Sequence, residues 1–453
     1  MVLCTGLTIF FSCRKSEPFP EEKLDMRMSG GLNYTLFDAS SSAFSTMIPG
    51  MNPRNVFVHE LGDGLFEAKF VSVPAPVNPG LGPIFNNTSC VSCHQRDGRG
   101  RPPTPGDKTR AMLFRISVPG TDEHGGPKPV PGYGVQLQDK ALSGTQPEAD
   151  VTMSYSEKAV TLKDGTVIRL HVPHYTLINP YVPLPAKVLL SPRIAAQTVG
   201  AGIINAIAED QILQHADPED KDGDGISGRP NWVYDQTSQS KQLGRFGWKA
   251  NVASLSDQVA AAFQQDMGIS NYIFPEESSK GQSQFPEQNT EGVNIRDSLL
   301  DATIFYMATL AVPARRNVNK PETQQGARLF AEIGCQKCHV ATFTTKVNVA
   351  FRPLSHQTVH PYSDFLLHDM GDALSDHRPD FEASGNEWRT APLWGIGLTE
   401  KVSGYTYYLH DGRARSLIEA ILWHGGEAAA SREAFSELAP TDRQAVLAFL
   451  NSL

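Results

Sequence analysis

The sequence predicts a mainly α-helical protein of two similar domains, the first enlarged by an insertion that contains loops and strands. Three observations support this fold class. A C-x-x-C-H motif occurs twice among the 453 residues, a short internal repeat follows each motif, and helix-like apolar patterns flank the second motif. The length suffices for two or three domains. We expect a signal segment at residues 1–22, a first domain at 23–318 and a second at 319–453.

The predicted N-terminal segment resembles an export signal. Residues 1–11 are almost wholly apolar, and Ser12-Cys13 is followed at once by Arg14-Lys15, as in a bacterial lipobox whose cysteine is lipidated. The basic stretch that usually opens such a signal is missing, which predicts a start further upstream; a buried strand is the alternative. Later stretches fall short of the roughly 20 apolar residues that span a bilayer. We therefore expect a periplasmic or cell-envelope protein that touches the membrane only through lipid on Cys13.

The elements of the body follow from local patterns. Many of the 32 prolines and 38 glycines fall between the two motifs, which predicts irregular structure with short strands such as residues 165–171. Apolar periodicity and capping residues, including Thr441 as an N-cap, predict helices at 201–208, 211–213, 297–311, 322–332 and 441–450.

The net charge of −9 limits the kinds of partner that the protein can bind well. An acidic surface argues against nucleic acid or an anionic membrane as the main partner. A small basic electron-transfer protein is a better electrostatic match, although an acidic excess is also a common means of staying in solution.

The two C-x-x-C-H motifs predict two covalently bound c-type hemes. The thiols add to the vinyl groups of the heme, and the adjacent histidine becomes an axial ligand of the iron. A zinc site would need a second cysteine pair nearby, whereas each pair here is completed by a histidine. The predicted heme-binding residues are Cys90, Cys93 and His94 in the first motif, and Cys335, Cys338 and His339 in the second.

The internal repeat matches residues 246–255 with residues 408–417. Trp248 in one copy and His410 in the other precede a Ser-Leu pair by the same interval, and a helical pattern follows. The interval from motif to repeat is longer by about 80 residues in the first domain, which predicts the insertion. A helix before the second motif and a closing helix after it resemble a class I cytochrome c domain.

The repeat also orders the candidate sixth ligands of the irons. His424, which follows the helical pattern of the second copy, is the predicted ligand of the second heme, with Met370 as its rival. The equivalent position in the first copy is Ala262, which cannot bind iron, so the first heme is predicted to be the more open one. His124 or Met267 could still cap it, and either could equally be a surface or packed residue.

Beyond these motifs, the sequence resembles a known family. Residues 89–94, 222–229, 243–250, 388–394 and 409–413 resemble the di-heme oxidoreductase/putative peroxidase family, sometimes labelled thiol oxidoreductases, within the bacterial di-heme cytochrome c peroxidase superfamily. The resemblance covers residues 80–453. The thiol label gains no support, because no cysteine is left in the body once the hemes are attached.

The resemblance implies roles for three further residues. Trp248 matches a tryptophan between the two hemes, Gln258 an active-site glutamine, and Asp266 lies two residues short of an active-site glutamate. Gln258 would orient a peroxide and Asp266 would move its proton. Trp248 could instead be a core aromatic, and the other two could lie on an exposed helix face. His424 stands where relatives have Met or Tyr, which should lower the potential of that heme relative to Met ligation.

A separate acidic loop predicts calcium. Asp220, Asp222 and Asp224 alternate before a glycine, and Ile226 offers its carbonyl oxygen, a pattern that wraps oxygen ligands around a hard cation. Asn231 stands where an EF-hand has glutamate, so the loop is not a standard EF-hand. An exposed Asp/Gly turn is the alternative.

Together these patterns predict an exported di-heme oxidoreductase that reduces a peroxide at the first heme. Its expected partners are a small redox protein or a quinol-linked electron donor, and a small-molecule oxidant. Two other functions are compatible with the same residues: an electron carrier with both irons six-coordinate, and an O2-dependent oxygenase acting on an organic substrate.

Overall fold

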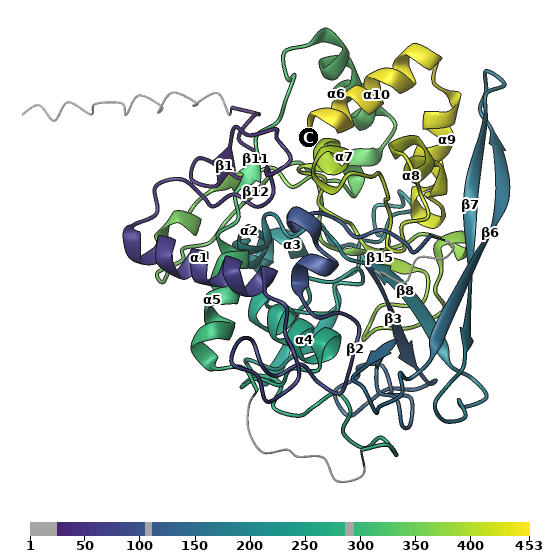
Figure 1. The fold of residues 1–453 in the computed structure, drawn as a ribbon. Coiled ribbons are helices and arrows are strands. Elements are labelled where there is room, and N and C mark those ends of the chain that lie inside the picture. The colour runs from purple at the N-terminus through teal and green to yellow at the C-terminus, as the bar shows by residue number, and fades with distance from the viewer. Residues whose placement is uncertain (1–24, 105–110, 286–293) are drawn as a thin grey trace, which may run out of the picture.

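The structure, a computed structural model, describes residues 25–104, 111–285 and 294–453 (Figure 1). The predicted signal segment and Cys13 lie outside the described residues. No helix of the described part is both long enough and apolar enough to cross a membrane.

The predicted fold class, mainly α with two class I cytochrome c-like domains, is wrong. Helices of every kind make up 28% of the described residues, and strands and bridges make up 20%, spread over many small sheets. Most of the strand residues lie between Met112 and Ile194, where the sequence predicted an insertion of loops and strands. This part of the chain is rich in β-branched and aromatic residues, which pack well on a pleated surface.

The largest β element is a hairpin. Its strands β6 (Asp150–Thr161) and β7 (Val167–Ile178) pair antiparallel along their whole length, from Asp150 opposite Ile178 to Thr161 opposite Val167. Alternate side chains of β7 point to opposite faces, so that Ile168, Leu170 and Val172 join an apolar cluster with the C-terminal helices. The hairpin runs along the edge of the molecule beside α8 (Leu417–Trp423) and α9 (Ala429–Glu437) (Figure 1).

A three-stranded antiparallel sheet lies next to the hairpin. It has the order β4-β3-β8, with β3 at Met112–Ser117, β4 at Gln136–Leu137 and β8 at Leu189–Ile194. The remaining strands form two-stranded pairs: β1 (Thr35–Leu36) with β11 (Val312–Pro313), β2 (Ile84–Phe85) with β5 (Lys140–Ala141), β9 (Trp232–Asp235) with β10 (Ser240–Leu243), β12 (Phe343–Thr344) with β13 (Thr358–Val359), and β14 (Leu367–Asp369) with β15 (Glu387–Arg389).

One helix pair supports each motif. Near the first motif, α1 (Pro53–Glu67) packs on α5 (Asp297–Ala308), and near the second α6 (Pro321–Glu332) packs on α10 (Pro440–Ser452). Each crossing places a glycine against a backbone carbonyl, Gly62 against Ala302 and Gly326 against Ala445, where a Cβ would collide. The two crossings are thus equivalent.

The predicted helices are present with shifted ends. Residues 201–208 and 211–213 correspond to α2 (Ala201–Ala206) and α3 (Glu209–Leu213). The closing helix begins at Pro440 with Ala439 as its N-cap, so the prediction that Thr441 is the N-cap is wrong; proline is favoured at a first helical position. The sequence reading missed α1. The other helices are α4 (Leu255–Met267), α7 (Thr399–Ser403), α8 (Leu417–Trp423) and α9 (Ala429–Glu437).

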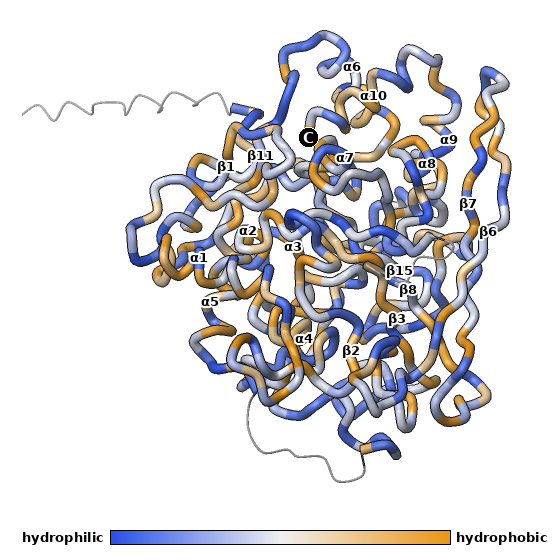
Figure 2. The backbone as a smooth tube through the Cα atoms, in the orientation of Figure 1, coloured by the Kyte–Doolittle hydropathy of each residue, from blue (hydrophilic) through white to orange (hydrophobic). Residues whose placement is uncertain are grey.

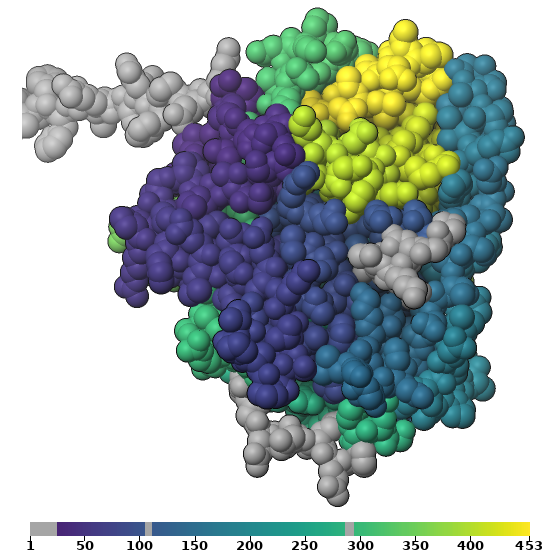
Figure 3. Space-filling model, viewed as in Figure 1, coloured from purple at the N-terminus to yellow at the C-terminus, as the bar shows by residue number. Residues whose placement is uncertain are grey.

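The larger apolar core crosses the predicted domain boundary. It joins residues of α2, α4 and α5 to Phe343, Phe365 and Val402 from the C-terminal part of the chain. Orange segments of these helices meet in the middle of the molecule in Figure 2. On the face shown in Figure 3, N-terminal and C-terminal segments are in direct contact. The division at residues 318/319 stays a prediction.

Candidate functional site: two adjoining cavities

Each C-x-x-C-H motif forms a tight turn. Cys90–Ser92 and Cys335–Lys337 are short 3-10 turns, and the backbone N–H of each motif histidine donates to the carbonyl of the first cysteine, at 3.0 Å in both cases. The turn brings both thiols and the imidazole of a motif to one side of the backbone, as attachment to a single heme requires.

The first motif opens into a cavity, called the first cavity below. Its walls include all three motif residues and four residues of α4 that the sequence indicated as candidates: Gln258, Ala262, Asp266 and Met267. The α4 helix is held in place at its start, where the hydroxyl of Ser254 accepts the N–H of Asp257 at 3.2 Å.

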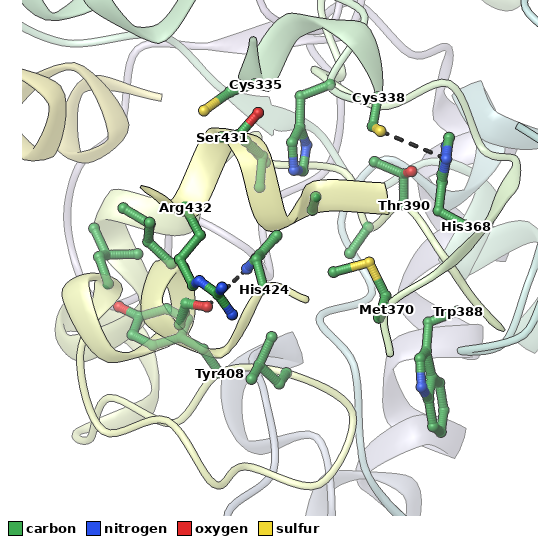
Figure 4. A pocket seen from close by; sticks show the side chains of 18 of the residues that line it. Cys335, Cys338, His368, Met370, Trp388, Thr390, Tyr408, His424, Ser431 and Arg432 are labelled. Carbon is green, nitrogen blue, oxygen red and sulfur yellow. Dashed lines mark hydrogen bonds between the residues drawn. The ribbon is translucent and has the colours of Figure 1, made fainter. Parts of the chain in front are cut away.

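The second motif opens into another cavity, called the second cavity below. Cys335, Cys338, Met370 and His424 border one space in Figure 4. His424 directly follows α8, whose start repeats that of α4: the hydroxyl of Ser416 accepts the N–H of Glu419 at 3.2 Å. The structure thus brings the second motif and its predicted sixth ligand into one cavity.

The two cavities share a wall. Arg99, Trp248, Arg389 and Ala391 line both. The indole Nε1–H of Trp248 donates to the carbonyl of Ile194 at 2.9 Å, which holds the ring in this position. The tryptophan expected between two hemes therefore lies between the two cavities.

The residues present fit heme in both cavities. Each cavity holds two thiols and an imidazole from one turn, and the larger part of its lining is apolar. In the second cavity the Nδ1 of His339 bonds the carbonyl of Tyr362 at 2.9 Å, and the Nδ1 of His424 bonds the carbonyl of Ala420 at 2.7 Å. Both neutral rings then keep Nε2 without a proton, the form that binds a metal.

A family model described as "Di-haem oxidoreductase, putative peroxidase" matches residues 23–453. The chain belongs to this family. No curated protein matches the chain. Among solved structures, hydrazine synthase of Kuenenia stuttgartiensis pressurized with xenon is similar, with 14% identity over 100% of both chains and a TM-score of 0.36, which is too low to carry an argument about fold or function.

Burial sets the protonation of the histidines of this di-heme oxidoreductase. Desolvation lowers the pKa of His94 and of His339 to about 4, so both imidazoles are neutral at neutral pH. Desolvation also lowers the pKa of His424.

The candidates for a sixth ligand of the first heme are placed unequally. Met267 is buried and lines the first cavity, as does Ala262. His124 lines neither cavity; it stacks on Tyr234 with ring centroids 3.7 Å apart. For the second heme, both His424 and Met370 line the cavity.

Asp266 and Gln258 of the di-heme oxidoreductase face the same space. Desolvation raises the pKa of Asp266, whose Oδ1 accepts the amide of Gln136 at 2.6 Å. The nearby charge of Arg115 opposes that rise. A carboxyl group in this setting can hold a proton and release it within the cavity.

The sequence reading assigned no ligand or cavity role to His410. It lines the second cavity, stacks on Trp388 with ring centroids 3.6 Å apart, and leaves its Nε2 buried without a hydrogen bond among the described residues. The buried ammonium of Lys249 also lies over the ring of Trp388, 4.3 Å from the ring centroid. The sequence did contain a signal that could have pointed to His410, because this residue matches Trp248 in the internal repeat.

The arginines of the shared wall were also missed. Arg99 follows the first motif in an Asp-Gly-Arg-Gly run, and Arg389 lies in one of the segments that carry the family resemblance. Nothing in the sequence alone says that two such distant residues meet at one wall.

The acidic loop brings its three carboxylates together. Ligand atoms of Asp220, Asp222 and Asp224 lie within 4.8 Å of one another. The ammonium of Lys337, within the second motif, pairs with Asp224 at 3.0 Å, and Ile226 lines the second cavity. The loop is therefore connected directly to the second motif.

Proposed function

We propose that this di-heme oxidoreductase reduces a small peroxide in the first cavity, with the second heme as its electron-transfer centre. The observation that carries the proposal is the difference at one position of the repeat, His424 in the second cavity against Ala262 in the first. A heme with two firm protein ligands only passes electrons, whereas one with an open position can bind a small molecule.

The chain would hold both cofactors as covalent c-type hemes. The thiols of Cys90 and Cys93, and those of Cys335 and Cys338, would form the thioether bonds. His94 and His339 would each supply one nitrogen ligand to the iron, and His424 would supply another at the C-terminal site. Bound heme would supply an iron that accepts and returns electrons and binds a peroxide oxygen.

In the first cavity, two side chains would act on the peroxide. The carboxylate of Asp266 would take a proton from one peroxide oxygen and return it to the other, which then leaves as water. The amide of Gln258 would hydrogen-bond the peroxide and orient it. Hydrogen peroxide, two electrons and two protons give two waters, so an external donor must deliver both electrons.

Electrons would cross between the cavities through Trp248. Its indole lies on the shared wall, and the Arg99 guanidinium carbon is 5.8 Å from its ring centroid. For the external donor we propose a small redox protein or a quinol-linked donor. We also propose a periplasmic or cell-envelope location, with a lipid anchor on Cys13; the apolar start of the sequence and its lipobox-like cysteine support this.

The first test is spectroscopic. Absorption and EPR spectra of the oxidised and half-reduced protein are recorded before and after one equivalent of hydrogen peroxide. We expect a high-spin ferric signal from one heme that is lost when peroxide is added. Two low-spin hemes that ignore peroxide in both redox states would contradict the proposal and favour an electron carrier. A reaction with O2 but not with peroxide would favour an oxygenase.

We also propose that the loop of Asp220, Asp222 and Asp224 binds calcium, with the carbonyl oxygen of Ile226 as a further ligand. The closeness of the carboxylates supports this, and calcium favours several oxygen ligands of this kind. Calcium would displace the ammonium of Lys337 from Asp224. Titration calorimetry of the chelator-treated protein should show binding that Asp222→Asn weakens. An unchanged heat signal in that variant would rule the loop out.

A further inference from the structure

The wall between the two cavities carries two arginines, Arg99 and Arg389, that form no ion pair with a described carboxylate. Arg99 is 5% exposed, and its guanidinium forms no ion pair and no hydrogen bond with the described residues. Two aromatic rings lie near it: those of Trp248 and Tyr408 are both 5.8 Å from the guanidinium carbon. Arg389 donates to the carbonyls of Gly247 and Thr390, at 2.8 and 3.2 Å, and likewise pairs with no described carboxylate.

Buried cations elsewhere in the described part of the protein are held in two ways. Arg193 pairs with Asp380 at 2.9 Å and Lys249 pairs with Asp376 at 3.1 Å, whereas Arg245 donates to the carbonyl of Ile204 at 3.2 Å and Arg315 donates to the hydroxyl of Tyr362 at 3.1 Å. Burying a charge without a counter-ion is costly, so buried cations in proteins are normally paired. Two arginines on one wall make the cost larger. Burial is the main cause that lowers the pKa of Arg389 to about 10; the charge of Asp364 opposes this shift, and the charge of Arg99 adds to it.

The position of the two arginines identifies the missing anions. Both line both cavities, whereas the cysteines of each motif line only their own cavity. In heme c the thioether bonds form at one edge of the ring, and the two propionate carboxylates lie at the opposite edge. Arginine is the residue that best binds carboxylates, through its planar fork of N–H donors.

We propose that Arg99 and Arg389 form one shared anion site, which binds propionate groups of both hemes. The inference rests on the proposed function only in that both cavities must contain heme. A site shared in this way would couple the two hemes: a charge change at either arginine would be felt on both sides of Trp248. Arg99 and Arg389 would be positioning residues for the cofactors, not catalytic residues.

The test measures the midpoint potentials of both hemes in the full-length, heme-loaded protein, by spectroelectrochemical titration at several pH values. Losing the positive charge beside a carboxylate favours the oxidised iron. We therefore expect Arg99→Gln to lower both potentials, and Arg389→Gln to do the same. Both potentials should also become pH-dependent near neutral pH, since an unpaired buried propionate takes up a proton there.

Two kinds of variant keep the test decisive. Arg99→Lys and Arg389→Lys retain the charge, and should fold and keep the potentials nearer to wild type even if the glutamine variants lose heme. Arg316→Gln is the matched control: this arginine is also held by backbone carbonyls, those of Ala314, Asn451 and Leu453, and lines neither cavity. It should leave both potentials unchanged.

The outcomes separate this inference from the proposed function. Two-heme glutamine variants with wild-type, pH-independent potentials would overturn the inference and leave the proposed function standing. Unchanged potentials with a raised KM for a carboxylate-bearing substrate would also overturn it, because the arginines would then bind substrate. A wild-type protein without heme would overturn both.

Discussion

The surroundings of the two motifs are built alike up to the point where a sixth ligand is needed. In both, a phenylalanine lies beside the motif histidine at the same distance and tilt: Phe66 and His94 have ring centroids 6.1 Å apart at 55°, and Phe330 and His339 have theirs 6.0 Å apart at 53°. The glycine crossings of the supporting helices also match. Even the turn before α4 and α8 closes with the same antiparallel bridge, Phe246 with Val252 and Tyr408 with Ala414.

The difference begins within the helix that follows that turn. The first copy continues as α4 through Ala262 to Met267, while α8 ends at Trp423 and leaves His424 at its C-cap, before two glycines. The two helices begin alike, yet the equivalent position presents the methyl group of Ala262 to the first cavity and the imidazole of His424 to the second. Under the proposed function, this one side chain decides whether the iron at each motif is open or closed to a small molecule.

Exchanging these two side chains should have the largest effect. We expect Ala262→His to close the first heme with a second nitrogen ligand, so that its high-spin EPR signal and nearly all peroxide turnover disappear. His424→Ala should open the second heme, unless Met370 replaces the lost ligand, in which case the signal stays low-spin with a shifted potential. Peroxide turnover and EPR spectra of both variants check this; full activity in Ala262→His would contradict the comparison.

Removing the carboxyl group of the first cavity should have the next largest effect. Asp266→Asn keeps the size of the side chain but cannot exchange a proton, so we expect kcat with peroxide to fall roughly 10²–10⁴-fold. The EPR spectrum should stay unchanged, because Asp266 is not a proposed ligand. Asp210→Asn, on the surface of α3, is the control and should react like wild type. A loss of less than tenfold in Asp266→Asn would remove this residue from the mechanism.

Substitutions at the two glycines test whether the two helix crossings are equally close. Gly62→Ala and Gly326→Ala each force a methyl group against a carbonyl, and we expect each to lower the free energy of unfolding by about 1–3 kcal/mol. Gly64→Ala, on the open face of α1, has nothing within 4 Å and should gain about 0.5–1 kcal/mol instead. Denaturant titrations measure all three. Equal effects of the changes at residues 62 and 64 would contradict the close crossing.

A further prediction, which affects only the pH dependence of stability, concerns the β-rich segment, which has no counterpart at the second motif. Glu148 is buried there, accepts the N–H of Gln138 and the amide of Gln282 at 2.5 Å each, and burial raises its pKa to about 8. Because this pKa is raised on folding, stability is greatest below the unfolded-state pKa and declines as the pH rises through about 8. The decline is on the order of a few kcal/mol at most.

Glu148→Gln cannot ionise and should flatten this pH dependence. Unfolding free energies at about pH 5 and about pH 9 should differ less in the variant than in the wild type. An equally steep dependence in both proteins would show that another group is responsible.

Some of the fold could be predicted from local patterns and some could not. Helices such as α5, α6 and α8 were found because their periodicity and flanking residues lie within one short stretch of sequence. The fold class was wrong because strands make up 20% of the described residues, in many small sheets, against 28% for helices; the segment before Ile194, predicted as a large insertion of loops and strands, builds a sheet and a long hairpin. Strand pairing depends on partners elsewhere in the chain, which no local pattern reveals.

The candidate site divides in the same way. The sequence by itself determined the two cysteine–histidine motifs, the repeat that aligns Ala262 with His424, and the family, because these depend on spacing along the chain. Only the tertiary structure decided that Trp248 lies between the cavities and that Arg99 and Arg389, which are far apart in the sequence, meet on their shared wall. Burial and charge balance are properties of the packed molecule, and they exist only once distant segments are brought together.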